Sequence, residues 1–122
     1  MVQQTQSTEA ISNAQETVYA FIKAMNSFDY AKARTFVNDD MSFVGVMGSR
    51  EGADIYFNDM QHMKFQYDIK KAFSDETDVC LFYDINMSGI VIFSCGWYHL
   101  KEGKIQTIRV LFDPRPLLEK QK

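Results

Sequence analysis

The sequence predicts an α+β fold, in which a cone-shaped, curved antiparallel sheet of about four to five strands is covered by three N-terminal helices. Two observations carry this prediction. The hydrophobic spacing is helical in the first half of the chain and changes to a period of two at Lys64. Turn signals at Ser88-Gly89 and Glu102-Gly103 then separate runs of β-branched and aromatic residues. A curved sheet closed by helices encloses a space, which is the default place for a ligand.

Two helices are predicted at the N-terminal end. Thr8 can cap the first, which ends near Asn26-Ser27. Its apolar stripe consists of Ile11, Val18, Phe21, Ile22 and Met25. A short second helix is predicted from Tyr30 to Val37, and Asn38-Asp39-Asp40 is predicted to be a turn.

A strand and a third helix follow. The segment MSFVGVMG, residues 41–48, is typical of a strand, and its glycines at 45 and 48 mark places where the backbone bends or approaches closely. Ser49 is a candidate cap for a helix from Arg50 to about His62.

The second half of the chain predicts a four-stranded meander. Its strands are expected at 64–73, 78–87, 90–101 and 104–113. The tail PRPLLEKQK is closed to further strand pairing by its two prolines.

One domain, residues 8–116, accounts for most of the 122 residues, with a disordered N-terminus at 1–7 and a flexible tail at 117–122. The formal net charge is −3 and the 13 Lys and Arg residues are scattered, which argues against a nucleic-acid partner. No apolar run approaches the ~18 residues that a membrane span needs, and no signal peptide is visible. We therefore expect a cytoplasmic protein without a membrane partner.

No metal or cofactor site is predicted. Cys80 and Cys95 lie in apolar, strand-like runs without a Cys-x-x-Cys spacing, so we expect reduced core cysteines. His62 and His99 lie outside any metal-ligand spacing.

Three segments carry a resemblance to a known family. The helix TVYAFIKAMNSFD, the NDD before MSFVGVMGS, and the ending GWYHLKEGKIQTIRVLFDP are similar to those of the nuclear-transport-factor-two-like superfamily. This group includes SnoaL-like polyketide cyclases, ketosteroid isomerases and limonene epoxide hydrolases, and the resemblance covers roughly residues 12–114. It implies a SnoaL-like domain with the cone fold. Members range from enzymes to binding modules, so the fold alone does not fix the function.

The resemblance allows the isomerase positions to be compared one at a time. The hydrogen-bonding tyrosine corresponds to Phe21, and the general-base aspartate corresponds to Gly45. The protonated aspartic acid falls near Cys95 or Gly96. None of these residues can supply the chemistry of the isomerases.

The epoxide hydrolases match slightly better. Their Arg-x-Asp segment resembles Phe82-Tyr83-Asp84, which keeps the acid and loses the arginine. Their second aspartate corresponds to Val110. A single carboxylate cannot both activate water and protonate a leaving oxygen, so the sequence favours a protein that is not an enzyme.

The orientation of Asp84 depends on the hairpin that follows it. A three-residue loop, Met87-Ser88-Gly89, turns Asp84 into the cone and sets the side chains of Cys80 and Cys95 on opposite faces, where no disulfide can form. A two-residue Ser88-Gly89 turn shifts the register by one residue and reverses every side chain. The apolar alternation of the strand favours the shorter turn, and both registers stay open.

The leading hypothesis is a protein that binds a small apolar or aromatic molecule in the cone. The first alternative is a SnoaL-like lyase, isomerase or hydrolase that uses Asp84 as acid or base. The second is a dimeric interaction module whose cavity is filled by its own aromatic side chains. The residues expected to line the cavity are Phe21, Tyr56, Phe82, Tyr98, Ile108, Val110 and Phe112.

A homodimer is predicted through the opposite face of the sheet. Trp97, Arg109 and Leu111 lie on that face, and such a mixture of aromatic, apolar and arginine side chains is typical of an interface centre.

Overall fold

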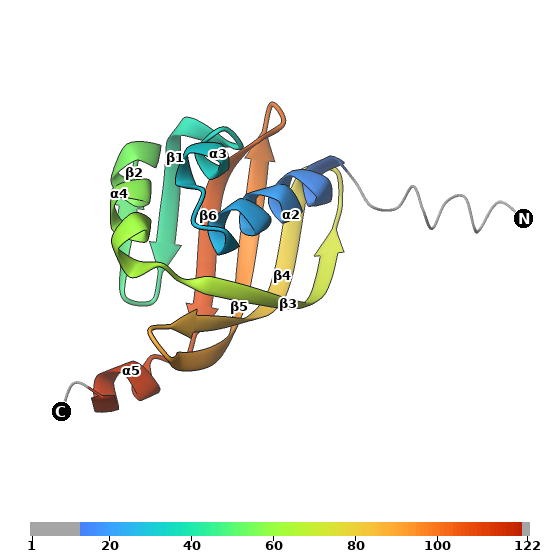
Figure 1. Cartoon of the computed structure of the whole chain (residues 1–122). Coiled ribbons are helices and arrows are strands. Elements are labelled where there is room, and N and C mark those ends of the chain that lie inside the picture. Colours follow the sequence, from blue (N-terminus) through green and yellow to red (C-terminus); the bar gives the residue numbers. More distant parts are fainter. Residues whose placement is uncertain (1–12, 121–122) are drawn as a thin grey trace, which may run out of the picture.

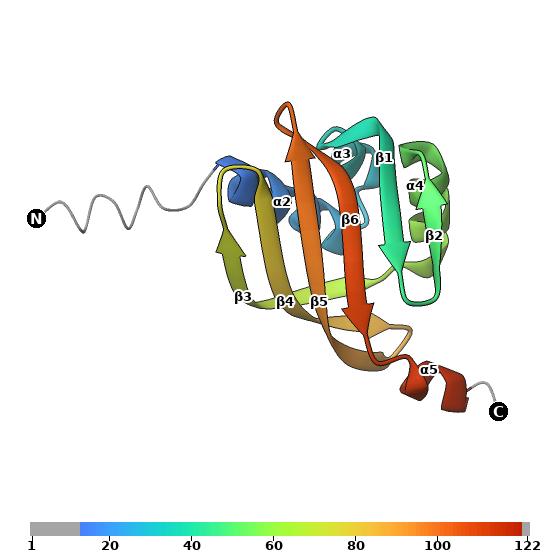
Figure 2. The same ribbon diagram turned by 180° about the vertical axis from the view of Figure 1, so that it is seen from behind.

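Within the described residues, the three helices that precede the meander lie on one face of a six-stranded curved sheet (Figure 1). The computed structural model describes residues 13–120. Seen from behind, the other face of the sheet carries no helix in this part of the chain (Figure 2). We call the helix-covered face the inner face and the opposite one the outer face. The α+β cone predicted from the sequence is confirmed, although the sheet has more strands than expected.

Helix α2 (Asn13–Asn26) crosses the inner face and ends where the sequence predicts. Its stripe of Val18, Phe21, Ile22 and Met25 is buried, which fixes the helix to the sheet. At its end the Asn26 side chain exchanges two hydrogen bonds, of 2.8 and 2.7 Å, with the backbone of Tyr67. The predicted start at Thr8 lies outside the described residues.

Helix α3 (Tyr30–Arg34) is shorter than predicted, because the chain leaves it to join the sheet. Asp29 caps it by accepting a 3.1 Å hydrogen bond from the Lys32 backbone N–H. Strand β1 (Val37–Gly45) starts at the residue where the helix was expected to end. Its pairing with β6 (Lys104–Phe112) is irregular between Val37 and Ser42.

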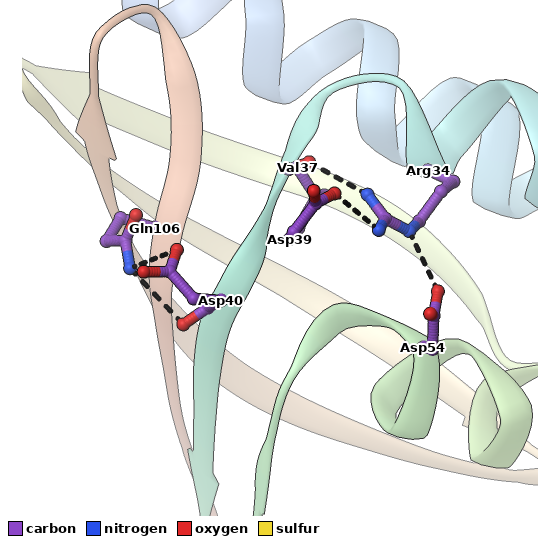
Figure 3. A network of polar contacts seen from close by, with 6 residues as sticks. All are labelled: Arg34, Val37, Asp39, Asp40, Asp54 and Gln106. Carbon is purple, nitrogen blue, oxygen red and sulfur yellow. Dashed lines mark hydrogen bonds and ion pairs between the residues drawn. The ribbon is translucent and has the colours of Figure 1, made fainter.

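The turn predicted at Asn38-Asp39-Asp40 is therefore wrong, because these polar residues belong to β1. Figure 3 shows Asp39 and Asp40 in this strand. Asp39 lies 2.7 Å from the guanidinium of Arg34, which also reaches Asp54 at 3.3 Å. Gln106 donates hydrogen bonds to the backbone and side chain of Asp40. Side-chain contacts to neighbouring elements thus hold a polar segment extended that would otherwise favour a turn.

Strand β2 (Gly48–Glu51) was not predicted. It pairs with β1 and contains Ser49, the expected helix cap, and Arg50, the expected first residue of the helix. Helix α4 (Ala53–Met63) begins after Gly52, whose φ of 95° favours glycine, so the predicted cap at Ser49 is wrong. The helix ends at Lys64 in the left-handed conformation.

The remaining strands are β3 (Gln66–Ser74), β4 (Asp78–Met87) and β5 (Ile90–Lys101), followed by β6. The four form the predicted meander, and the strand order of the whole sheet is β2-β1-β6-β5-β4-β3. Only β1 and β6 pair in parallel among the described strands. Helix α5 (Arg115–Lys120) forms within the segment expected to be a tail and lies beyond the end of β6 (Figure 1).

The hairpin between β4 and β5 has the shorter of the two turns considered. Met87 pairs with Ile90, and Ser88 and Gly89 both have positive φ, as a two-residue hairpin turn requires. Leu81, Tyr83 and Ile85 are consequently buried on the inner face. The register that turned Asp84 into the cone is wrong.

No helix within residues 13–120 is long and apolar enough to cross a membrane.

Candidate functional site

A cavity of about 270 Å³ lies between helix α4, the β1–β2 hairpin and the inner face of β4, β5 and β6. Leu117 of helix α5 also borders it. This volume is just below the usual range of ligand sites, about 300–1,000 Å³, and well above the roughly 150 Å³ that holds benzene. The cavity is therefore large enough for a molecule of about two rings.

Five of the seven residues expected at the cavity border it in the structure. They are Tyr56, Tyr98, Ile108, Val110 and Phe112. The other two do not. Phe21 is fully buried behind the wall, with its ring centroid 6.2 Å from that of Tyr98. Phe82 lies on the outer face, 6.2 Å from the ring of Phe93, because the two-residue turn reverses β4.

Four tyrosines give the cavity wall its polar character: Tyr56, Tyr67, Tyr83 and Tyr98. Tyr98 donates a hydrogen bond of 3.3 Å to the hydroxyl oxygen of Tyr83. The ring of Tyr67 meets that of Tyr83 edge-on at 5.2 Å. Burial raises the pKa values of Tyr56, Tyr83 and Tyr98 above 10.0, so these phenols are neutral at physiological pH. Neutral phenols can donate hydrogen bonds to a ligand oxygen.

Gly96 makes room for the tyrosine pair. A Cβ atom at this position would lie 2.5 Å from the Tyr83 hydroxyl and 2.9 Å from Cε1 of Tyr98. Glycine within a strand often marks such a close approach. Because any side chain at position 96 would overlap both rings, the glycine there supports the placement of Tyr83 and Tyr98.

An ion pair borders the cavity between β2 and α4. Arg50 Nε donates to the Asp59 carboxylate, and Arg50 Nη1 donates to the backbone oxygen of Ser49 at 2.7 Å. The exposed side chains of Met47 and Met63 also border the cavity, which places its mouth at this end. The site thus joins an apolar interior to a charged entrance.

Asp84, the catalytic candidate, is not part of this site. It pairs with Phe93 on the outer face, and its carboxylate lies 3.8 Å from Lys70 Nζ. Lys70 is also 2.8 Å from Asp68, so the cluster is an ion-pair network at the sheet surface. An acid on that face cannot reach a molecule held in the cavity. The described residues contain no group of three or more His, Cys, Asp or Glu side chains that could hold a metal ion.

Sequence reasoning missed the cavity roles of Tyr67, Tyr83, Arg50 and Asp59. The signal for Tyr83 was the apolar alternation of β4, which pointed to the shorter turn. No local signal indicates Arg50, because its place depends on the unpredicted strand β2.

The outer face carries a second hollow, a groove of about 700 Å³ bordered by Cys80, Cys95, Trp97, Arg109 and Leu111. Large apolar side chains are exposed on this face, with Phe93 at 61% and Leu111 at 68%. The Arg109 guanidinium lies 5.7 Å from the centre of the Trp97 ring. Contiguous exposed apolar surface of this kind marks interaction sites.

Comparison with known proteins defines the class of protein that has this fold and cavity. The chain is 46% identical to a crystallised NTF2-like protein of unknown function from Cytophaga hutchinsonii. The match covers 86% of this chain and 94% of that one, with a TM-score of 0.85. The chain therefore belongs to the nuclear-transport-factor-two-like family.

More distant structures share the fold alone. A protein from Kribbella flavida matches with 22% identity, a TM-score of 0.79 and coverage of 88% and 93% of the two chains. An LEH-like epoxide hydrolase from M. tuberculosis matches with 19% identity, a TM-score of 0.75 and coverage of 88% and 87%. Neither the protein-family models nor the curated proteins gave a match.

Proposed function

We propose that this protein binds a small apolar or aromatic molecule in the cavity between helix α4 and the sheet. The observation that carries the proposal is the combination of apolar walls with buried, neutral tyrosine hydroxyls in a space of about 270 Å³. Such a site favours a ligand of one or two rings that bears a carbonyl or hydroxyl group.

The geometry supports binding more than catalysis. Asp59 is the only carboxylate among the described residues that border the cavity, and Arg50 holds it in an ion pair. General acid–base chemistry needs two groups that exchange protons with the substrate, and the tyrosines hold their protons too strongly to act as a base at neutral pH. The hypothesis of an enzyme that uses Asp84 loses its basis with the outward position of that residue.

Isothermal titration calorimetry with 2-naphthol tests the proposal. We expect binding with a dissociation constant on the order of 100 µM, as suits a ligand of this size. Ile108→Trp fills the cavity and should abolish the binding heat while the far-ultraviolet circular dichroism stays unchanged. Val91→Trp adds the same side chain to the exposed outer face and should leave the binding unaltered. Equal loss in both variants, or no heat with the wild type, would disprove the proposal.

We also propose that two copies of the chain associate through the outer face. The support is the exposed apolar set on that face, together with Arg109 stacked near Trp97. The cytoplasm, where thiols such as Cys80 and Cys95 stay mostly reduced, is the proposed location.

A further inference from the structure

Cys80 and Cys95 lie side by side on the outer face of the sheet. The three-residue loop considered from the sequence would place them on opposite faces. The sulfur atoms of Cys80 and Cys95 are 3.4 Å apart. Both side chains are half-buried and both thiols are free. The prediction of opposite faces is wrong, because it rested on the three-residue loop that the structure does not have.

The register of β4 and β5 explains the contact. Cys80 is opposite Trp97, and Cys95 is opposite Phe82, so the cysteines occupy diagonal positions on one face. Diagonal side chains of an antiparallel pair come within reach of each other. Both cysteines border the groove of the outer face, which gives a small reagent access to them.

We propose that Cys80 and Cys95 form a redox modification site, in which a low-molecular-weight disulfide such as oxidised glutathione reversibly converts the two thiols to an intramolecular disulfide. Nothing in the proposed binding function requires this chemistry, since the pair lies on the opposite side of the sheet from the cavity.

The exchange has two steps. One cysteine thiolate attacks a sulfur of the small disulfide, so that a mixed disulfide forms and one small thiolate leaves. The second cysteine then loses its proton and attacks the protein sulfur of the mixed disulfide, which forms the Cys80–Cys95 bond and releases the second small thiolate. Two protein thiols are oxidised, one small disulfide is reduced to two small thiols, and the reverse steps restore the dithiol.

Two features shape the behaviour of the site. Diagonal positions are more widely separated than directly opposed ones, so we expect a bond that small thiols reduce easily. Burial, helped by the contact with Cys80, raises the pKa of Cys95 to about 11. The exchange should therefore accelerate as the pH rises toward that value, since the thiolate is the reacting species.

The test uses the full chain, reduced and then exposed to oxidised glutathione at low protein concentration, so that a second copy does not cover the outer face. Free thiols are then alkylated without reduction, and the intact mass is measured. We expect a loss of two hydrogens and no alkyl group. Cleavage after methionine separates the cysteines into fragments 64–87 and 88–122. These fragments should stay joined until a reductant is added.

Cys80→Ser and Cys95→Ser are the matched controls. Each has one thiol and should stop at the mixed disulfide with glutathione, so the mixed species should be on the order of ten times more abundant than in the wild type. Two alkyl groups on the wild type, fragments that separate without reductant, or the same amount of mixed disulfide in wild type and variants would each overturn the proposal.

Discussion

The hydroxyl groups of Tyr83 and Tyr98 lie 3.3 Å apart on the inner face of the sheet, one from β4 and one from β5. This contact depends on the register of the two strands, because a shift of β4 by one residue would move the Tyr83 ring to the outer face while Tyr98, paired with β6, stays on the inner face. It also depends on Gly96, which leaves the space that the Tyr83 hydroxyl occupies. The polar end of the proposed ligand site is therefore built by strand pairing.

Gly96→Ala should destabilise the protein by about 1–3 kcal/mol, because the new methyl group would overlap the Tyr83 hydroxyl. Urea unfolding followed by circular dichroism measures the change. The double variant Gly96→Ala with Tyr83→Phe removes the overlapping oxygen and should recover part of the loss. Strictly additive effects of the two substitutions would show that the overlap is not the cause.

Tyr83→Phe should weaken the binding of 2-naphthol by roughly fivefold, which corresponds to the loss of one hydrogen bond of about 1 kcal/mol. Naphthalene, which has no hydroxyl, should bind wild type and variant alike. Calorimetric titration of both probes into both proteins gives the comparison. If the variant weakened the binding of both probes equally, Tyr83 would act through packing alone.

The free energy of unfolding should be constant near neutral pH, begin to fall above about pH 9 because of the raised pKa of Cys95, and fall more steeply above about pH 10 because of the buried tyrosines. Burial raises the pKa values of Tyr56, Tyr83 and Tyr98 above the 10.0 of the unfolded chain. Above that pH the unfolded state binds fewer protons than the folded state, so deprotonation favours unfolding. Urea unfolding at a series of pH values measures the slope, and Tyr56→Phe should flatten it. An unchanged slope in this variant would contradict the conclusion that the Tyr56 phenol is buried and has a raised pKa.

Phe93→Lys should shift the protein toward the monomer, because a charge on the outer face opposes the proposed self-association. Sedimentation velocity at micromolar concentration measures the distribution. Ile55→Lys, at a similarly exposed position on helix α4, is the control and should leave it unchanged. A wild type that sediments as a monomer at these concentrations would refute the dimer.

Much of the fold could be predicted because its signals are local. The limits of β4 and β5 follow from alternation and from turn residues that lie next to each other in the chain. The extended form of the Asn38-Asp39-Asp40 segment could not be predicted, since it depends on the contact with Gln106, which lies 66 residues from Asp40 in the chain, as well as on that with Arg34. Strand β2 and the ion pair of Arg50 with Asp59 could not be predicted either, because both depend on partners that the folded chain brings together.

The candidate site depended on one local choice, the length of the Ser88-Gly89 turn. This single residue of register decides whether Tyr83 or Asp84 faces the cavity. The same choice places Cys80 beside Cys95. The sequence contains evidence for the shorter turn in the apolar alternation of β4, but the outer face is also apolar, which weakens that signal.

The most direct test of ligand binding in the cavity uses the methionine methyl groups as reporters. Met47, Met60, Met63 and Met87 border the cavity, whereas Met25 and Met41 are buried elsewhere in the core. In a protein with carbon-13-labelled methionine methyls, 2-naphthol should shift the first four nuclear magnetic resonance signals in a saturable manner and leave those of Met25 and Met41 nearly unchanged. Unmoved signals from the four cavity methionines would contradict a ligand site in the cavity.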